Sequence, residues 1–303
     1  MRTTLLILTS PPASGKTFWI KDFSINFDPE DLLVLAPLRA LVNECLTKWE
    51  GTIDVRTPEE WSASPVAKPV VIFDEAHLTY YWGNTFRQRL WETFYEVSLT
   101  AELVIFLTAT LPEWMRRDIE LMGHFDRKLW VDCGNQRLRF APKSYLRFPG
   151  KKLLLSFLEE ERKSAGCTLV FCAYRQEVTA VAELLRKKGR SVLTCLGGEA
   201  AEFSRRLALV GTCDFIVATT VLSHGVNLPL IQRVVLLYEV GNEDFWVQMV
   251  ARGGRSGAGY EVLALEKPPG IKWNPVVNFL KILWITLRIK IHFFLRQEWF
   301  LKD

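Results

Sequence analysis

The sequence has 303 residues, of which 49% are hydrophobic, and a formal net charge of +4. A chain of this length and composition can bury about two domain cores, which excludes global disorder. Its six cysteines show no CxxC spacing and its four histidines are scattered. We therefore expect a reducing, cytoplasmic setting and no structural metal site.

Positive charge is concentrated in two stretches, Cys133–Leu158 and Lys267–Gln297, which contain six Lys or Arg residues each and no acid. Twelve of the 38 basic residues lie there, which leaves 26 against 34 acidic residues elsewhere. Such a distribution is typical of a surface that binds a polyanion, so we expect a nucleic-acid partner. Solvated connectors or helix faces are the alternative interpretation.

A phosphate-binding loop is predicted at Ser10–Thr17, SPPASGKT, between the apolar strand Thr3–Thr9 and a helix that begins near Phe18. In this context the loop amides and the helix N-terminus bind phosphates, Lys16 reaches the β- and γ-phosphates, and the Thr17 hydroxyl binds Mg²⁺. Ser10 stands where this motif usually has its first glycine.

Two adjacent acids, Asp74 and Glu75, follow the apolar strand Val70–Phe73. Because parallel strands end at one sheet edge, these acids are expected beside Lys16. Asp74 is suited to bind Mg²⁺ and Glu75 to deprotonate the attacking water. An acid pair that only stabilises a helix N-terminus is the alternative.

Other strands of the first half end in polar turns. Leu32–Leu38 leads into Pro37 and Arg39, and Val104–Leu107 leads into Thr108 and Thr110. At this edge of a parallel sheet such turns are placed for ligand contact, although ordinary turn chemistry explains them equally well.

The ordered segments SPPASGKT, APLRALVNE, VVIFDEAH and LTATLP resemble motifs I, Ia, II and III of the superfamily 2 helicases, and DEAH resembles their DExH-type members. In the second half, TLVFC, ATTVLSHGVNLP and QMVARGGR resemble motifs IV, V and VI. The resemblance implies an α/β fold of two tandem RecA-like domains with parallel sheets, at 1–145 and 146–268, followed by a helical tail at 269–303.

The resemblance also implies the roles of particular residues. Gln248, Arg252 and Arg255 of QMVARGGR become catalytic, with both arginines reaching the γ-phosphate from the second domain. Ser14, Gly15, Gly225 and Asn227 join Lys16, Thr17 and Asp74 as ATP contacts, and Thr17, Asp74 and Glu75 become the Mg²⁺ site. The sequence departs from the family where Thr220 replaces the usual acid and where Met249 and Ala251 stand in motif VI.

By the same resemblance, Pro37, Arg39, Thr110 and Thr219 contact a nucleic-acid backbone, DNA or RNA. The implied activity is that of an ATP-dependent helicase or translocase driven by closure and opening of the two domains. A duplex translocase that does not separate strands is one alternative. A nucleotide-dependent clamp or loading subunit is another, which the intact Glu75, Gln248 and arginines argue against.

The tail from Trp273 to Asp303 repeats apolar residues at helical spacing, interrupted by Lys and Arg. It contains no apolar run of about 18 residues, so a membrane partner is not expected. Three interpretations remain for the tail. It packs as core on the second domain, it docks a protein partner or forms a dimer, or its aromatic residues line a strand-binding groove or a membrane surface.

Overall fold

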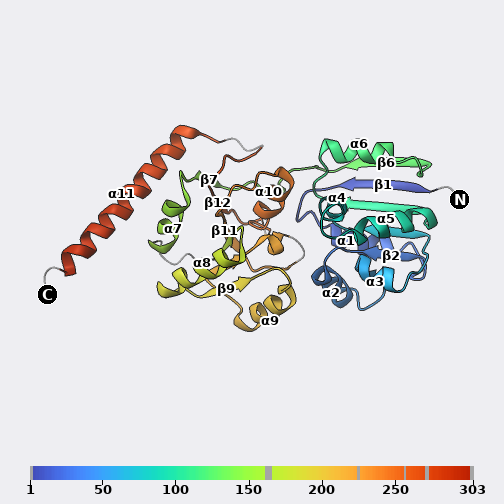
Figure 1. The fold of residues 1–303 in the computed structure, drawn as a ribbon, viewed down its shortest axis with the longest axis horizontal. Helices are drawn as coiled ribbons and strands as arrows, with labels where there is room; N and C mark the ends of the chain where they lie inside the picture. The colour runs from blue at the N-terminus through green and yellow to red at the C-terminus, as the bar shows by residue number, and fades with distance from the viewer. Residues whose placement is uncertain (1–2, 161–165, 224–225, 256, 270–272, 301–303) are drawn as a thin grey trace. The chain divides into compact units, whose positions relative to one another are not determined.

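The computed structural model describes residues 3–160, 166–223, 226–255, 257–269 and 273–300. The chain divides into two compact units, Met1–Arg139 and Phe140–Asp303 (Figure 1). The division precedes the predicted boundary after residue 145, because strand β7 (Ser144–Arg147) hydrogen-bonds β12 (Glu261–Ala264) in the second sheet. Each unit is an α/β domain built on a six-stranded parallel sheet.

The first sheet has the strand order β3-β2-β4-β5-β1-β6. Its strands are β1 (Thr4–Thr9), β2 (Leu32–Leu35), β3 (Asp54–Arg56), β4 (Val70–Phe73), β5 (Leu103–Thr108) and β6 (Arg127–Asp132). Its helices are α1 (Lys16–Ser24), α2 (Arg39–Lys48), α3 (Pro58–Ala63), α4 (His77–Gly83), α5 (Arg89–Thr100) and α6 (Glu113–Leu121). The central strands β2 and β4 are buried along their whole length, as expected when helices cover both faces of a parallel sheet.

Alternate side chains of these strands enter two separate cores. Leu32 and Val34 pack with Ile20 of α1 and Val42 of α2 on one face. On the opposite face the strands pack against α3 to α6 through aromatic and apolar side chains, among them Trp61, Tyr80, Phe94 and Met115. Because both faces of the sheet are buried, the strands are held in fixed register. The predicted site lies at their carboxyl ends.

The second sheet has the order β7-β12-β11-β8-β10-β9. Besides β7 and β12, its strands are β8 (Cys167–Phe171), β9 (Val192–Cys195), β10 (Phe215–Ala218) and β11 (Ile231–Leu236). The connecting elements are α7 (Lys151–Glu160), α8 (Arg175–Lys187), α9 (Ala200–Val210), the 3₁₀ turn η1 (Thr220–Ser223) and α10 (Glu243–Val250). Gly189, which follows the C-cap of α8, has a φ of 72°, in the left-handed region where glycine is favoured.

The tail forms one long helix, α11 (Pro275–Phe300), which Figure 1 shows in red. Ile282 and Ile285 are buried in the core of the second unit, and the Asn278 side chain exchanges hydrogen bonds with the backbone of Arg147. The opposite face exposes a row of large apolar side chains: Val276, Leu280, Leu283 and Leu287. The interpretation of the tail as core therefore holds for one face of the helix, and a partner for the other face stays a prediction.

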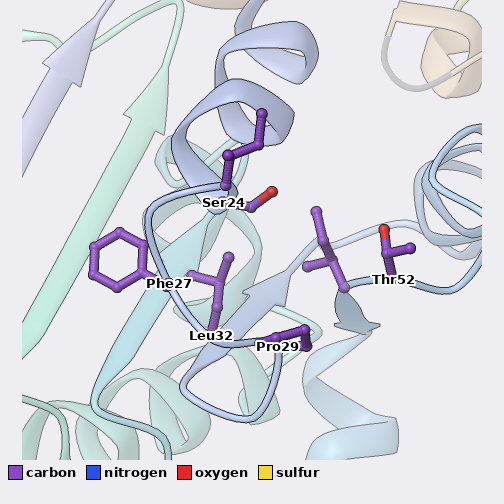
Figure 2. A pocket seen from close by; sticks show the side chains of 7 residues that line it. Ser24, Phe27, Pro29, Leu32 and Thr52 are labelled. Atoms are coloured by element: carbon purple, nitrogen blue, oxygen red, sulfur yellow. The ribbon is translucent and has the colours of Figure 1, made fainter.

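None of the helices that the structure describes is long and apolar enough to span a membrane. A cavity of about 200 Å³ opens near the amino end of β2, lined by Phe27, Pro29 and Leu32 among others (Figure 2). Ser24 and Thr52 also line it; the Ser24 hydroxyl donates to the Lys21 carbonyl within α1, and the Thr52 hydroxyl donates to the Trp49 carbonyl. Leu32 is the first residue of β2, whereas the predicted phosphate loop follows the last residue of β1. Because the strands of this sheet are parallel, the cavity and the loop lie at opposite ends of the strands.

Candidate nucleotide and nucleic-acid site

The phosphate-binding loop connects β1 to α1, as the sequence predicts. Gly15 precedes the first helical residue with a φ of 97°, a conformation that side chains disfavour. The hydroxyls of Ser10 and Ser14 share a hydrogen bond across the loop, and Lys16 Nζ donates to the Ser10 carbonyl at 3.4 Å. Ser10 is buried, so the residue that replaces the usual glycine closes the base of the loop.

The acid pair follows β4 at the same sheet edge. Asp74 is buried, and its pKa is raised to about 7 by burial and by the adjacent Glu75, while Lys16 opposes the shift. Glu75 has a φ of 49°, a strained conformation for a residue with a side chain. The structure therefore brings Lys16, Asp74 and Glu75 into one electrostatic cluster, as the sequence predicts.

This donor set fits a magnesium ion. Thr17, Asp74 and Glu75 offer only oxygen ligands, which Mg²⁺ prefers. Burial and then the neighbouring Glu75 raise the pKa of Asp74, and a bound cation would offset the negative charge of these two carboxylates. No cluster of three or more His, Cys, Asp and Glu side chains that could hold a metal occurs in the described part of the chain. Proteins commonly hold Mg²⁺ through one or two carboxylates together with substrate phosphates.

Close polar contacts link the acid pair to the turn after β5. His77 is fully buried, its Nδ1 lies 3.5 Å from Glu75 Oε2, and the same nitrogen is 2.9 Å from Thr108 Oγ1. Thr108 Oγ1 donates to the Thr110 carbonyl at 2.8 Å. Glu75, His77 and Thr108 therefore form a continuous chain of contacts that ends at Thr110.

Residues at and after the end of β6 also contact the site, in a region where the sequence analysis expected a polyanion-binding surface or a solvated connector. Asp132 accepts hydrogen bonds from Thr9 and from two backbone amides, which lower the pKa of its carboxyl. Asn135 exchanges two hydrogen bonds with the backbone of Leu111, and Arg139 donates to the Ala13 carbonyl in the phosphate loop. The sequence feature that could have indicated these contacts is that Asn135 and Arg139 lie in a basic stretch rich in turn residues.

The predicted nucleic-acid contacts differ in exposure. Arg39 is exposed, with its guanidinium 3.8 Å from Glu60. Pro37 is buried, and the Thr110 side chain is fully buried without a hydrogen-bond partner among the described residues. The structure thus presents Arg39 for phosphate contact and does not present the Thr110 side chain. In the second unit, Thr219 is half-buried directly after β10.

The motif VI residues of the second unit also differ in exposure. Arg252 is buried and donates to the carbonyls of Ser223 at 3.1 Å and Val226 at 2.7 Å. Arg255 is exposed, and Gln248 is buried with no hydrogen-bond partner for its Nε2 among the described residues. In this structure Arg252 therefore braces motif V, and its role at the γ-phosphate stays a prediction. Asn227 is exposed, and Gly225 lies outside the described residues.

The fold and the first-unit site together define a P-loop protein with two RecA-like domains. Residues 150–257 match the family model described as the helicase conserved C-terminal domain. The ATP-dependent RNA helicase DBP3 of Eremothecium gossypii is 27% identical over 216 residues, which are 66% of this chain and 39% of that protein. The DEAD-box ATP-dependent RNA helicase 5 of Oryza sativa subsp. japonica is 32% identical over 110 residues, which are 34% of this chain and 21% of that protein.

Solved helicase structures share the fold at low sequence identity. S. cerevisiae Dbp5 bound to RNA and ADP BeF3 has a TM-score of 0.68 at 16% identity, with 94% of this chain and 83% of that chain covered. Mycobacterium smegmatis helicase Lhr bound to ssDNA and AMP-PNP has a TM-score of 0.64 at 15% identity, with 86% and 43% covered.

These findings support a superfamily 2 helicase. The curated relatives are DEAD-box proteins, so they do not confirm the DExH subtype predicted from the DEAH sequence at Asp74–His77. The chain spans about two fifths or less of the length of the relatives it matches first.

Proposed function

We propose that this chain is an ATP-dependent RNA helicase or translocase. The observation that carries the proposal is the convergence of Lys16, Asp74 and the strained Glu75 at the carboxyl edge of the first sheet. RNA is the preferred track because the curated relatives are named RNA helicases. The exposed Arg39 supplies a contact suited to a phosphate backbone, which carries little sequence preference.

Different residues of the first unit have different roles in the hydrolysis step. Loop amides and Lys16 would hold the phosphates, and Thr17 and Asp74 would hold Mg²⁺, which supplies charge neutralisation at the phosphates. Glu75 orients a water molecule and accepts its proton while the water oxygen bonds to the γ-phosphorus and the bond to the β-phosphate oxygen breaks. Roles for Gln248, Arg252 and Arg255 in this step stay predictions.

The test is steady-state ATP hydrolysis at low salt with no polynucleotide and with single-stranded RNA, duplex RNA, single-stranded DNA and duplex DNA. We expect single-stranded RNA to stimulate hydrolysis most. Stimulation only by blunt duplexes would favour the duplex translocase, and ATP binding without hydrolysis would favour the clamp.

Two variants test the assignment of the site. Lys16→Ala and Glu75→Gln should each abolish measurable turnover, and for Glu75→Gln the loss expected from removing a general base is about 10²- to 10⁴-fold. Glu96→Gln, an exposed change on α5, is the matched control and should hydrolyse ATP normally. Unchanged turnover in Lys16→Ala or Glu75→Gln would refute the mechanism.

A further inference from the structure

Arg87 is a side chain that the sequence motifs do not account for, and it joins three segments of the first unit. It lies between α4 and α5, and its Nε and Nη2 grip the Glu59 carboxylate of α3 at 2.7 to 3.0 Å. Its remaining nitrogen, Nη1, donates to the Pro37 carbonyl at 2.5 Å. The guanidinium carbon lies 5.6 Å from the centre of the Trp82 ring.

The Glu59 end of this network is fixed. Thr57 and Glu60 form a capping box at the start of α3, with bonds of 3.2 Å and 2.9 Å in the two directions. A capped helix holds Glu59 in place, and a carboxylate that grips a guanidinium through several bonds fixes the plane of the guanidinium. The direction of Nη1 towards Pro37 is therefore set by α3.

At the Pro37 end, the bond from Arg87 is made to the turn that leads into Arg39. Only Leu38 separates the bonded Pro37 carbonyl from Arg39, which is the exposed cation suited to phosphate contact. At the other end, Arg87 follows α4, the helix that starts with His77 beside Glu75. Arg87 thus connects the segment of the hydrolytic carboxylate to the segment of the predicted nucleic-acid contact.

We propose that Arg87 is a positioning residue that holds the Pro37–Arg39 turn in the geometry required for nucleic-acid binding and ties that turn to α4. This inference rests on the proposed function. Its consequence is that loss of the bond to Pro37 weakens the response of hydrolysis to polynucleotide.

The test compares Arg87→Ala with Arg89→Ala. Arg89 lies two positions further along the chain and forms an exposed ion pair with Glu92. ATP hydrolysis is titrated with polyuridylate at low salt, binding of a labelled RNA oligonucleotide is measured by fluorescence anisotropy, and the melting temperature is recorded. We expect Arg87→Ala to raise the half-saturating RNA concentration about tenfold, as loss of a charge-assisted hydrogen bond permits. Arg89→Ala should leave it unchanged.

A charge swap separates positioning from simple stabilisation. Glu59→Arg combined with Arg87→Glu restores an ion pair but places a carboxylate, which cannot donate, beside the Pro37 carbonyl. The swap should recover much of the melting temperature lost in Arg87→Ala and none of the RNA affinity.

Three outcomes would overturn the inference. Equal half-saturation in Arg87→Ala and Arg89→Ala would show that Arg87 has no role in RNA binding. Recovery of RNA affinity in the swap would show that the ion pair alone matters. If the unmodified chain responds to no polynucleotide, the proposed function fails first and the inference fails with it, which the wild-type titration reveals separately.

Discussion

Arg252 offers the sharpest test of the structural assignment, because motif resemblance and structure give it different roles. The resemblance pairs it with Arg255 as a residue that reaches the γ-phosphate. The structure instead buries it, with bonds to the carbonyls of Ser223 and Val226. Arg252→Ala should therefore destabilise the second unit, whereas Arg255→Ala should impair hydrolysis and leave stability nearly unchanged, since Arg255 is exposed.

The magnitude follows from the two lost bonds. Hydrogen bonds that involve a charged group contribute about 1.5 to 3 kcal/mol each, and relief of a buried charge offsets part of that sum, so we expect a net loss of about 3 kcal/mol. For a unit of this size such a loss lowers the melting temperature by about 6 to 12 °C. Chemical denaturation followed by circular dichroism measures the free energy of unfolding. Equal unfolding free energies for Arg252→Ala and Arg255→Ala would refute the bracing role.

Two further changes probe packing and pH dependence. Gly253→Ala would place a Cβ 2.1 Å from the buried ring of Tyr260, so overpacking should cost about 1 to 3 kcal/mol, whereas Gly197→Ala, with no atom within 4 Å, should be neutral in the same denaturation assay. Burial lowers the pKa of His124, so protonation favours the unfolded chain and stability should fall as the pH drops below about 6.5. His124→Gln should flatten this decline in melting temperature between about pH 6.5 and pH 5, and equal slopes in the two proteins would contradict the assignment.

The strands and the hydrolytic residues were predictable from sequence because both depend on local patterns. Short apolar runs that end in polar turns predicted the positions of β1, β4 and β5, and α1 begins at Lys16, two residues before the expected start near Phe18. Since every strand in a parallel sheet points the same way, residues after different strands had to meet at one edge. This topological rule alone placed Lys16 beside Asp74.

Burial and long-range hydrogen bonds were not predictable, because a motif states residue types and not their surroundings. Arg252 and Arg255 look alike in QMVARGGR, and only the fold shows that one is enclosed by motif V. Arg139 bonds the Ala13 carbonyl across 126 positions of sequence, a pairing that no local spacing encodes. Arg87 was missed for the same reason, since its partners Pro37 and Glu59 belong to other segments.

The strained backbone of Glu75 shows how the sheet itself prepares the site. The amide of Asp74 donates to Leu35 of β2 at 2.9 Å, and the amide of Ala76 donates to Leu107 of β5 at 3.0 Å. These two bonds tie the residues on either side of Glu75 to different strands, so the chain must turn sharply at Glu75, whose φ is 49°. A residue in this region costs about 1 to 3 kcal/mol, which glycine would largely avoid. Glycine lacks a carboxylate, so the strain at Glu75 agrees with its proposed role as the base at that turn.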